Sequence, residues 1–362
     1  MGKTLSKYTN SRDNNFNLIR FIAASLVLYY HSFPLAGISG EPFSKYLGIS
    51  SGTIAVDVFF ICSGFLVSRS FFERNNIIAF TWARILRIYP ALIVAVLFCT
   101  LIVGLFFTQE WWFSYLMDSN THKFFLKNIT LFFGVEYTLP SVFTNNPFPN
   151  AVNGSLWTLP YEVKMYAYLA IIATFLNYLQ KLVGGKFIKL IFLFIAIFSL
   201  AAHITNHFQL FTSDNFIRLF SMFFVGVAFY LYRDNIYMSL KLFLFIFTIL
   251  LISIFNKESF FIIYSISLSY LIFYVAYVPS GVIRKFNKFG DYSYGMYIYA
   301  FPVQQSIAAM IPNVSFIAMV SISFFITLLL SFLSWNLIEK KLLKMKGSHV
   351  VFESMLKNIH LT

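Results

Sequence analysis

Charged residues are scarce in this sequence. Asp, Glu, Lys and Arg together make up 11% of the 362 residues, whereas an ordinary soluble domain carries roughly 25%. Hydrophobic residues reach 59% and include 47 Phe. This balance excludes an ordinary water-soluble enzyme and indicates an integral membrane protein.

Cysteine is also rare. The two cysteines, Cys62 and Cys99, both fall inside apolar runs, which argues against a disulfide framework and fits small hydrophobic side chains. No internal repeat is visible in the sequence. No short apolar core with a small-residue cleavage site precedes the first long apolar run, so we expect the first helix to be retained rather than removed as a signal peptide.

Long apolar runs, by contrast, are abundant. A hydrocarbon layer of roughly 30 Å needs about 20 residues of helix, and fewer where neighbouring helices shield the ends. We therefore predict an all-α polytopic membrane protein, a bundle of about ten transmembrane helices. The predicted spans are residues 16–35, 54–72, 88–107, 156–179, 187–203, 215–232, 238–255, 259–277, 292–311 and 315–337.

One long connection separates the third and fourth predicted spans. Residues 108–155 form a predicted extracytoplasmic loop, in which the apolar piece 124–133 is too short to span. We expect this piece to lie at the membrane interface or to re-enter the membrane. The domain organisation predicted is a single transmembrane domain over residues 1–341 with a short cytoplasmic tail over residues 342–362.

The distribution of positive charge predicts the orientation. Lys and Arg near short loops are retained on the cytoplasmic side. With the N-terminus inside, 21 of the 27 Lys and Arg residues lie on that side, and an even number of spans puts both termini in the cytoplasm. Topology thus accounts for most of the net charge of +13. We expect the lipid bilayer, and no nucleic acid, as a partner.

The first predicted span keeps two polar residues, Arg20 and His31. They are 11 residues apart, which is about 20° beyond three full turns and roughly 16 Å of rise, so they share one helix face. With the N-terminus inside, Arg20 lies near the cytoplasm and His31 in the outer half of the bilayer. Counting along the helices puts Asp57 and Glu162 at a depth similar to that of His31.

Three titratable groups at one depth are not expected to face lipid, where a charge costs at least about 2.5 kcal/mol. A carboxylate beside a histidine can fix the tautomer and stabilise the charged imidazole. We therefore predict that His31, Asp57 and Glu162 form a catalytic cluster.

Six stretches, taken in order, resemble the motifs of the membrane acyltransferase-3 family. The resemblance covers nearly the whole chain, from Asn14 to about Lys341. Members of this family are ten-span O-acetyltransferases that modify bacterial surface polysaccharides. The stretches read RFIAASLVLYYH, VDVFFICSGFLVSRSF, WARILRIYPALI, GSLWTLPYEVKMY, FGDYSYGMYIYAFPV and SWNLIEKK.

The resemblance implies that residues 1–341 are an acyltransferase domain. A member of this family would move an acetyl group from cytoplasmic acetyl-CoA to a hydroxyl of a surface polysaccharide, or of its undecaprenyl-linked precursor, as in O-antigen or exopolysaccharide modification. It would act as a multi-pass protein of the bacterial cytoplasmic (inner) membrane. Acetyl-CoA is then a co-substrate, and we expect no metal site and no permanently bound cofactor.

The phosphates of acetyl-CoA require side chains with forked donors, which arginine supplies. The arginines predicted to bind acetyl-CoA lie at the inner ends of the first three spans and are Arg20, Arg69, Arg84 and Arg87. We expect Pro90, just after the last of them, to stand at a helix start and to fix the direction of the chain there.

The acceptor is expected to enter from the outer side, where Ser63, Trp157 and Tyr161 are predicted to bind it. The chain departs from the family at Ala300, because many members have a histidine before the Phe-Pro of the ninth span. His31 must therefore act with the carboxylates or alone. Because no hydrolase-like domain follows residue 341, we expect any partner enzyme to be a separate protein.

Several residues also have a purely structural interpretation. His31 alone could be an interfacial anchor, and Arg84 and Arg87 could serve only to orient their helix. Asp57 could form an ion pair with Arg218 or Lys164, and Glu162 could do the same. Aromatic residues such as Trp157 are most simply interface anchors. Gly64 is expected to allow close helix packing.

Two alternatives for the whole protein stay open. A transporter or flippase of a sugar-lipid would also need many spans and buried charges, although the polar groups here concentrate in the first four spans and no inverted repeat is visible. An acyltransferase with a different acyl group or an amine acceptor is the second alternative. Acceptor choice is expected to reside in residues 108–155, in which the sequence shows no readable code.

Overall fold

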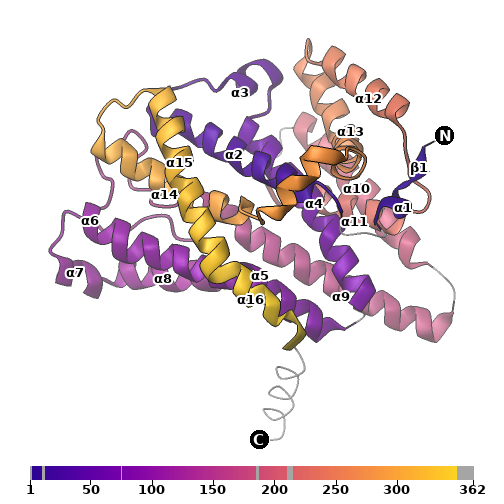
Figure 1. The fold of residues 1–362 in the computed structure, drawn as a ribbon, viewed down its shortest axis with the longest axis horizontal. Coiled ribbons are helices and arrows are strands. Elements are labelled where there is room, and N and C mark those ends of the chain that lie inside the picture. Colours follow the sequence, from indigo (N-terminus) through magenta and orange to yellow (C-terminus); the bar gives the residue numbers. More distant parts are fainter. Residues whose placement is uncertain (1, 10–12, 75, 185–186, 210–214, 349–362) are drawn as a thin grey trace, which may run out of the picture. The chain divides into compact units, whose positions relative to one another are not determined.

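The computed structural model describes residues 2–9, 13–74, 76–184, 187–209 and 215–348, and almost all of their regular structure is helical (Figure 1). The only strands in these ranges, β1 (Lys3–Thr4) and β2 (Tyr237–Met238), pair antiparallel. The prediction of an all-α membrane protein is confirmed. The α-helices are α1 (Leu5–Thr9), α2 (Phe16–Leu35), α3 (Pro42–Leu47), α4 (Ser51–Arg74), α5 (Ile77–Leu97), α6 (Leu105–Phe107), α7 (Trp112–Met117), α8 (Ser119–Thr130), α9 (Leu159–Val183), α10 (Ile188–Gln209), α11 (Asn215–Leu231), α12 (Leu240–Ser253), α13 (Lys257–Tyr277), α14 (Ser293–Met310), α15 (Phe316–Ser334) and α16 (Lys340–Leu343).

Short turns of other helix types connect or extend these elements. Two π-helical turns, η1 (Phe98–Gly104) and η4 (Trp335–Glu339), continue α5 and α15. The 3₁₀ turns are η2 (Gly154–Thr158), η3 (Gly281–Lys288) and η5 (Lys344–Ser348).

Each of the ten predicted spans overlaps a helix. Among the residues that the structure describes, six helices are long and apolar enough to cross a membrane. Two further apolar helices, α11 and α12, are shorter. The six are Phe16–Leu35, Ser51–Arg74, Ile77–Phe107, Ile188–Phe208, Lys257–Tyr277 and Phe316–Ser348.

The prediction that Pro90 stands at a helix start is wrong. Helix α5 begins eleven residues earlier than the predicted span, where the side chain of Asn76 caps it by accepting a hydrogen bond from the Ala79 N–H (2.9 Å), and Pro90 lies inside the helix. Proline removes one intrahelical hydrogen bond, which a long helix held by its neighbours tolerates. Arg84 and Arg87 interrupt the apolar run without interrupting the helix.

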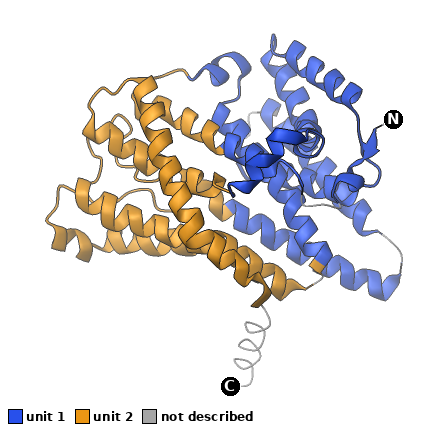
Figure 2. Cartoon of the chain, in the orientation of Figure 1, with its two compact units in different colours: residues 1–23, 41–73, 161–290 blue, residues 24–40, 74–160, 291–362 orange. Residues whose placement is uncertain are grey.

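The chain forms two compact units, and each unit draws on three separate stretches of sequence (Figure 2). Unit 1 consists of residues 1–23, 41–73 and 161–290, and unit 2 of residues 24–40, 74–160 and 291–362. Of the predicted tail 342–362, residues 349–362 lie outside the described residues. The same holds for three residues counted on the cytoplasmic side, Arg12, Lys186 and Lys357.

In unit 1, helices α4 and α11 approach each other to backbone contact at two glycines. A Cβ atom on Gly64 would lie 2.0 Å from the carbonyl oxygen of Phe223, and one on Gly226 would lie 2.3 Å from that of Ile61. Small residues allow this close packing. The expected packing role of Gly64 is therefore seen in the structure. Helix α10 packs beside α11, and α12 packs beside α13.

In unit 2, two continuous helices exceed the thickness of a membrane. Ile77–Phe107 has 31 residues and Phe316–Ser348 has 33, which at about 1.5 Å per residue gives roughly 45–50 Å, against about 30 Å of hydrocarbon. The first turns of Ile77–Phe107 pack on the last turns of Phe316–Ser348. The Trp82 indole N–H donates to the Met345 carbonyl oxygen there (3.1 Å). One end of each helix therefore lies beside one end of the other.

The predicted outer loop, residues 108–155, contains α7, α8 and irregular chain. Its apolar piece, residues 124–133, begins in the last two turns of α8, where Phe124 is buried, and ends in exposed Phe132 and Phe133. The Glu136 carboxylate lies 3.1 Å from the Lys123 ammonium and 3.6 Å from that of Lys127. Burial alone would raise the pKa of Glu136, but the two lysines hold this pKa below its ordinary value.

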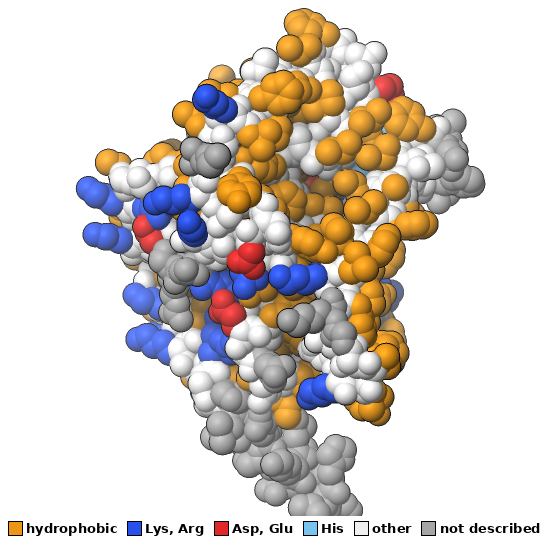
Figure 3. All heavy atoms as spheres, turned by 90° about the vertical axis from the view of Figure 1, so that its right-hand side faces the viewer, with side chains coloured by type: hydrophobic (Ala, Val, Ile, Leu, Met, Phe, Trp, Pro, Cys, Tyr) orange, Lys and Arg blue, Asp and Glu red, His pale blue; other side chains and the backbone are white. Residues whose placement is uncertain are grey.

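Apolar side chains also cover much of the surface. Figure 3 shows the face that lies on the right of Figure 1: hydrophobic side chains cover much of its upper and right parts, and most of the visible Lys and Arg side chains lie toward its left side. The exposed side chains of unit 1 include Phe245 and Ile252 of α12 and the neighbouring Phe255, which is 94% exposed. In water such a surface is an aggregation hazard, whereas lipid solvates it.

Candidate active site

His31, the predicted catalytic residue, lies near the end of α2 that belongs to unit 2. Its ring meets the ring of Phe301 edge to face, with centroids 5.1 Å apart and planes at 80°. The Nδ1 atom of His31 is buried and has no hydrogen-bond partner in the residues that the structure describes. A buried ring nitrogen without a partner is able to exchange a proton with a substrate group.

A hydrogen-bonded contact next to His31 joins α2 to α14. The side-chain amide of Gln304 donates to the Ser32 hydroxyl (2.7 Å) and to the Leu28 carbonyl oxygen (2.8 Å). Gln304 and Ser32 are fully buried. Because buried hydrogen bonds are costly to break, this contact fixes the turn of α2 that carries His31. Ala300, the position that departs from the family, is fully buried in α14.

The NGSLWT stretch also holds α14. The Asn153 side chain donates to the Ile298 carbonyl oxygen (2.9 Å), and the hydroxyls of Thr158 and Tyr297 lie 2.6 Å apart. A Cβ atom on Gly154 would lie 2.6 Å from the Phe301 ring, so only glycine leaves room for that ring. Residues 153–158 therefore position the aromatic side chain that packs on His31.

Asp57 lies in unit 1, fully buried on α4. It accepts a hydrogen bond from the Tyr264 hydroxyl of α13 (2.9 Å), and the Arg218 guanidinium of α11 lies 3.8 Å away. This is the ion pair that the sequence offered as the structural alternative. The other cation considered, Lys164, lies over the Tyr161 ring at 5.6 Å.

Two predicted residues of unit 1, Ser63 and Glu162, are brought into one hydrogen-bonded chain. The Tyr166 hydroxyl donates to the Glu162 carboxylate. Since a hydroxyl has one proton to donate, the Ser63 hydroxyl, 2.9 Å away, donates to Tyr166. The sequence analysis did not select Tyr166, although it stands four residues after Glu162, a spacing that puts two side chains on one helix face.

The proposed catalytic cluster is divided between the units. His31 belongs to unit 2, whereas Asp57 and Glu162 belong to unit 1, so their grouping stays a prediction. Within unit 1 the two carboxylates have different partners, because Asp57 binds Arg218 and Tyr264, and Glu162 binds Tyr166. Of the predicted acceptor residues, Trp157 lies in η2 of unit 2 and Tyr161 in the first turn of α9 in unit 1.

Arg87 is at the centre of a buried ion network in unit 2. Its guanidinium lies 2.6 Å from the Asp291 carboxylate and 3.4 Å from that of Glu339. The hydroxyls of Ser293 and Ser334 donate to the same two carboxylates. Three of the six motifs thus meet at one point. The sequence analysis missed Asp291 and Glu339, and the available signal was a lone carboxylate in each of two apolar motifs.

The other three predicted donor-site arginines lie beside a glutamate or an aromatic ring. Arg69 pairs with Glu73 (2.9 Å), whose side chain is half exposed. The guanidinium of Arg20 lies 6.0 Å from the Phe59 ring centroid, and that of Arg84 lies 5.9 Å from that of Phe80. Arg20 and Arg69 belong to unit 1, and Arg84 and Arg87 to unit 2. Across the described ranges, no three His, Cys, Asp or Glu side chains converge as a metal site.

Comparisons with known proteins identify the family of this chain. The sequence matches the family described as "Acyltransferase domain" over residues 13–336. It is 28% identical to an "O-acetyl transferase" of Shigella phage Sf6, over 92% of this chain and 96% of that protein. It is 29% identical to "Nodulation protein 10" of Rhizobium leguminosarum bv. viciae over 44% of each chain. No solved structure matches the chain.

The family match includes α2 with His31, the α4–α11–α13 contact around Asp57, and the Arg87–Asp291 pair of unit 2. It also includes the first five of the six motifs and the beginning of the sixth. Because it covers far more than half of the chain, the protein belongs to the membrane acyltransferase family and is an acyltransferase.

Proposed function

We propose that this protein transfers an acetyl group from cytoplasmic acetyl-CoA to a hydroxyl of a surface polysaccharide or of its undecaprenyl-linked precursor. In this proposal it spans the bacterial inner membrane ten times, with both termini in the cytoplasm. The observation that carries the proposal is His31, a residue whose buried Nδ1 has no partner within the described part of the chain and which lies on an apolar helix of an acyltransferase. The relative named an O-acetyl transferase supports the choice of acetyl.

The chemistry proposed for His31 is general base catalysis. The imidazole takes the proton of the acceptor hydroxyl while that oxygen attacks the thioester carbonyl carbon of acetyl-CoA. The carbon–sulfur bond then breaks, and the leaving thiolate takes the proton back from His31. The products are an O-acetyl ester and free coenzyme A. A carboxylate, Asp57 or Glu162, stabilises the charged imidazole between the two steps.

The donor is proposed to bind at the cytoplasmic ends of the helices. Arg20, Arg69, Arg84 and Arg87 bind the donor's phosphates in this proposal. At Arg87 the phosphate competes with Asp291 and Glu339. Arg20 stands roughly 16 Å below His31 along α2, a separation that the long, thin pantetheine arm can bridge.

The acceptor is proposed to approach His31 from the outer side. Ser63, Trp157 and Tyr161 contact it in this proposal. Aromatic faces suit the C–H surfaces of sugars because the ring face carries partial negative charge, and the Ser63 hydroxyl belongs to a hydrogen-bonded chain that ends at Glu162.

The test compares the surface polysaccharide of cells with and without this gene by mass spectrometry. We expect a difference of one acetyl group per repeat, which identifies both the acyl group and the acceptor. His31→Ala should remove the acetyl group while membrane abundance stays near normal, because the missing interaction belongs to the transition state. His122→Ala, which changes an exposed histidine of α8, should leave acetylation intact. Identical polysaccharides with and without the gene contradict the proposal.

A second measurement tests the direction of transfer. Inside-out vesicles that receive labelled acetyl-CoA from outside should label an acceptor in their lumen. Labelling that instead requires acetyl-CoA at the periplasmic face contradicts the cytoplasmic donor.

A further inference from the structure

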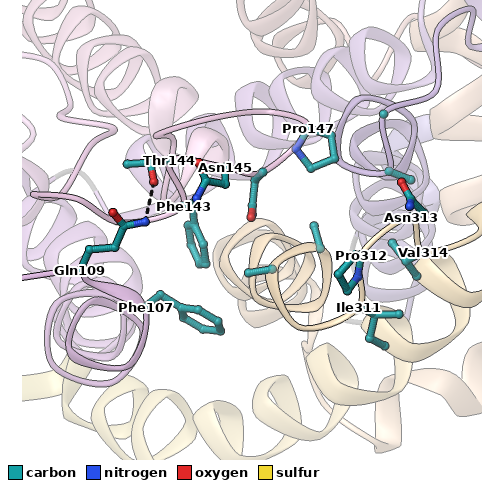
Figure 4. Close-up of a pocket in the computed structure, with 15 residues that line it drawn as sticks. Phe107, Gln109, Phe143, Thr144, Asn145, Pro147, Ile311, Pro312, Asn313 and Val314 are labelled. Atoms are coloured by element: carbon teal, nitrogen blue, oxygen red, sulfur yellow. Dashed lines mark hydrogen bonds between the residues drawn. The ribbon is translucent and has the colours of Figure 1, made fainter.

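Unit 2 contains a pocket of about 560 Å³ (Figure 4), within the range of roughly 300–1,000 Å³ found for small-ligand sites. Its wall is built from four places: the chain just after α2, the ends of α6 and α14, and the loop 143–147. In Figure 4, Gln109, Thr144 and Asn145 lie on one side of the view, and Pro312 and Asn313 on the other.

The lining is polar but uncharged. None of the lining residues is Asp, Glu, Lys, Arg or His. The polar ones carry amides or a hydroxyl, and the largest apolar ones are the rings of Phe107 and Phe143. Without a cation the pocket is poorly suited to phosphate or carboxylate groups, and therefore to acetyl-CoA. Amides that both donate and accept, next to aromatic faces, suit a neutral polyhydroxyl compound.

Part of this hydrogen-bonding capacity is unused. Asn145 and Asn313 are exposed to solvent, and within the residues that the structure describes their side-chain amides make no hydrogen bond. The amide nitrogen of Gln109 donates to Thr144 (3.0 Å), which leaves its amide oxygen to accept another hydrogen bond. Asn146, in contrast, already donates to the backbone and side chain of Gln305 (2.9 and 2.7 Å). Asn146 therefore holds the loop, whereas Asn145 and Asn313 can bind a ligand.

The backbone of the pocket is left-handed at two residues, and one of them, Phe143, disfavours this conformation. Phe143 has φ 57° and Asn313 has φ 56°, and a bulky residue such as Phe rarely takes this left-handed conformation. The Phe143 carbonyl oxygen accepts hydrogen bonds from the N–H groups of Asn146 (3.3 Å) and Asn150 (3.1 Å). Its ring packs on Phe107 with centroids 4.8 Å apart. Backbone held in this way is concentrated at ligand-binding sites.

The pocket lies close to His31 within unit 2. Two lining residues, Ala36 and Gly37, follow directly on α2, and Ala36 is five residues beyond His31, roughly 8 Å along the helix. The residue that follows the loop, Phe148, is also connected to His31 through aromatic rings. Phe148 packs on Phe301 at 6.1 Å, and Phe301 packs on His31 at 5.1 Å.

We propose that this pocket is a subsite for one neutral sugar unit of the acceptor, bound by Asn145, Asn313 and Gln109 and by the ring of Phe143. The role of that sugar as part of the acceptor rests on the proposed function, whereas the binding of a neutral sugar follows from the lining alone. The bound unit is a neighbour of the unit that receives the acetyl group, and it holds the glycan at the outer end of α2.

The binding test uses the full chain in nanodiscs and saturation-transfer NMR. The probes are the methyl glycosides of glucose, galactose, mannose and N-acetylglucosamine, with methyl glucuronoside as a charged member. We expect saturation transfer to at least one neutral glycoside at millimolar concentration, and less to the glucuronoside. The double variant Asn145→Ala, Asn313→Gly should lose the signal. Glycine is used at residue 313 because it takes the left-handed conformation without strain.

Two further variants make the test decisive. Asn120→Ala removes an exposed amide on α8 outside the pocket and should keep the signal. Ala309→Trp fills the pocket and should abolish the signal without removing any polar group, which covers the case in which the double variant does not fold. No glycoside signal from the wild type, or a signal that neither variant changes, overturns the proposal. Saturation transfer to decyl glycosides but not to methyl glycosides would also overturn it, because the pocket would then bind an alkyl chain rather than a sugar.

A kinetic measurement separates this proposal from the proposed function. With unacetylated polysaccharide as acceptor, the double variant should raise the acceptor KM about fivefold for each lost hydrogen bond and leave the half-saturating acetyl-CoA concentration unchanged. Acetyl transfer with an unchanged acceptor KM overturns the subsite and leaves the function standing. Glycoside binding that depends on Asn145 and Asn313, without acetyl transfer by the wild type, supports the subsite and contradicts the function.

Discussion

The guanidinium of Arg87 on α5 lies 2.6 Å from the carboxylate of Asp291, although 204 residues separate them in the sequence. Glu339 is the second carboxylate on the same arginine (3.4 Å). One guanidinium thus pairs with two buried carboxylates of unit 2, Asp291 just before α14 and Glu339 in η4. A buried charge that loses its partner is strongly destabilising, so this arginine has a structural task within unit 2.

Arg87 and Arg84 should therefore respond differently to the same substitution. Lysine keeps the positive charge that orients the helix but loses the planar fork. We expect Arg84→Lys to raise the half-saturating acetyl-CoA concentration severalfold, and Arg87→Lys to lower the thermal midpoint of the protein in nanodiscs. Arg87→Met should destabilise by about 3–5 kcal/mol.

Two measurements check these expectations. Titration of acetyl-CoA against each purified variant gives the half-saturating concentration, and a thermal scan gives the thermal midpoint. Half-saturation unchanged by Arg84→Lys would reduce this residue to an orientation signal. A thermal midpoint unchanged by Arg87→Met would show that the ion network contributes nothing to stability.

Gly154→Ala tests whether Phe301 positions His31. The added Cβ would lie 2.6 Å from the Phe301 ring, so the ring must move, and it packs on His31. We expect kcat to fall tenfold or more, since a misplacement of about 1 Å costs up to roughly 100-fold, with little change in the half-saturating acetyl-CoA concentration. Combining Gly154→Ala with Phe301→Leu should restore part of the activity. Gly347→Ala is the control, because no atom lies within 4 Å of the added Cβ there. If Gly154→Ala retains full activity, the ring does not position the histidine.

Asp57 has a structural and a catalytic interpretation that a double variant separates. Arg218→Met leaves the buried carboxylate without its cation and should destabilise by about 3–5 kcal/mol. Adding Asp57→Asn removes the unpaired charge and should recover most of that stability, while the Tyr264 hydroxyl can still donate to the amide oxygen. If acetyl transfer recovers together with stability, Asp57 acts only as a partner of Arg218. Recovered stability without recovered transfer assigns Asp57 a role in the reaction.

The lowered pKa of Glu136 predicts that the stability of the folded protein depends on pH. Its pKa in the folded protein lies below the ordinary value of 4.5 because of Lys123 and Lys127. A depressed folded-state pKa contributes stability that is fully present above the unfolded-state value and is lost as the pH falls through the folded-state pKa.

We therefore expect wild type to exceed Glu136→Gln in stability above pH 4.5. The difference should stay below about 1 kcal/mol, because both lysines reach the solvent and Glu136 is only partly buried, and should vanish at lower pH. Thermal scans in nanodiscs at a series of pH values measure it. A difference that persists in acid would show that the glutamine itself disturbs the loop.

The helices could be predicted from the sequence because apolar length is a local property. Helix α2 has the predicted bounds, Phe16–Leu35, and each other predicted span overlaps a helix. The start of α5 could not be predicted by the same count, because Arg84 and Arg87 break the apolar run. What allows Arg87 to sit inside that helix is a pair of carboxylates more than 200 residues away, and a single sequence does not reveal such partners.

The candidate site shows the same division between local and distant information. His31 was selected from its spacing to Arg20 on one helix, and Glu162 from its depth. Tyr166, which joins Ser63 to Glu162, and Phe301, which packs on His31, depend on contacts between helices. The pocket depends in part on left-handed backbone at Phe143, for which the residue type gives no signal.

The uncharged lining of the pocket also separates the two substrates by their response to ionic strength. Salt screens attraction between charges over a Debye length of about 10 Å at 0.1 M, so acetyl-CoA, if the arginines hold it as we propose, should bind more weakly as salt is added. A neutral sugar bound by Asn145 and Asn313 has no such attraction to lose. The enzyme would then bind the glycan equally well at any salt concentration in the outer compartment, which follows the surroundings of the cell. Only the binding of acetyl-CoA would depend on salt, and it would take place in the buffered cytoplasm.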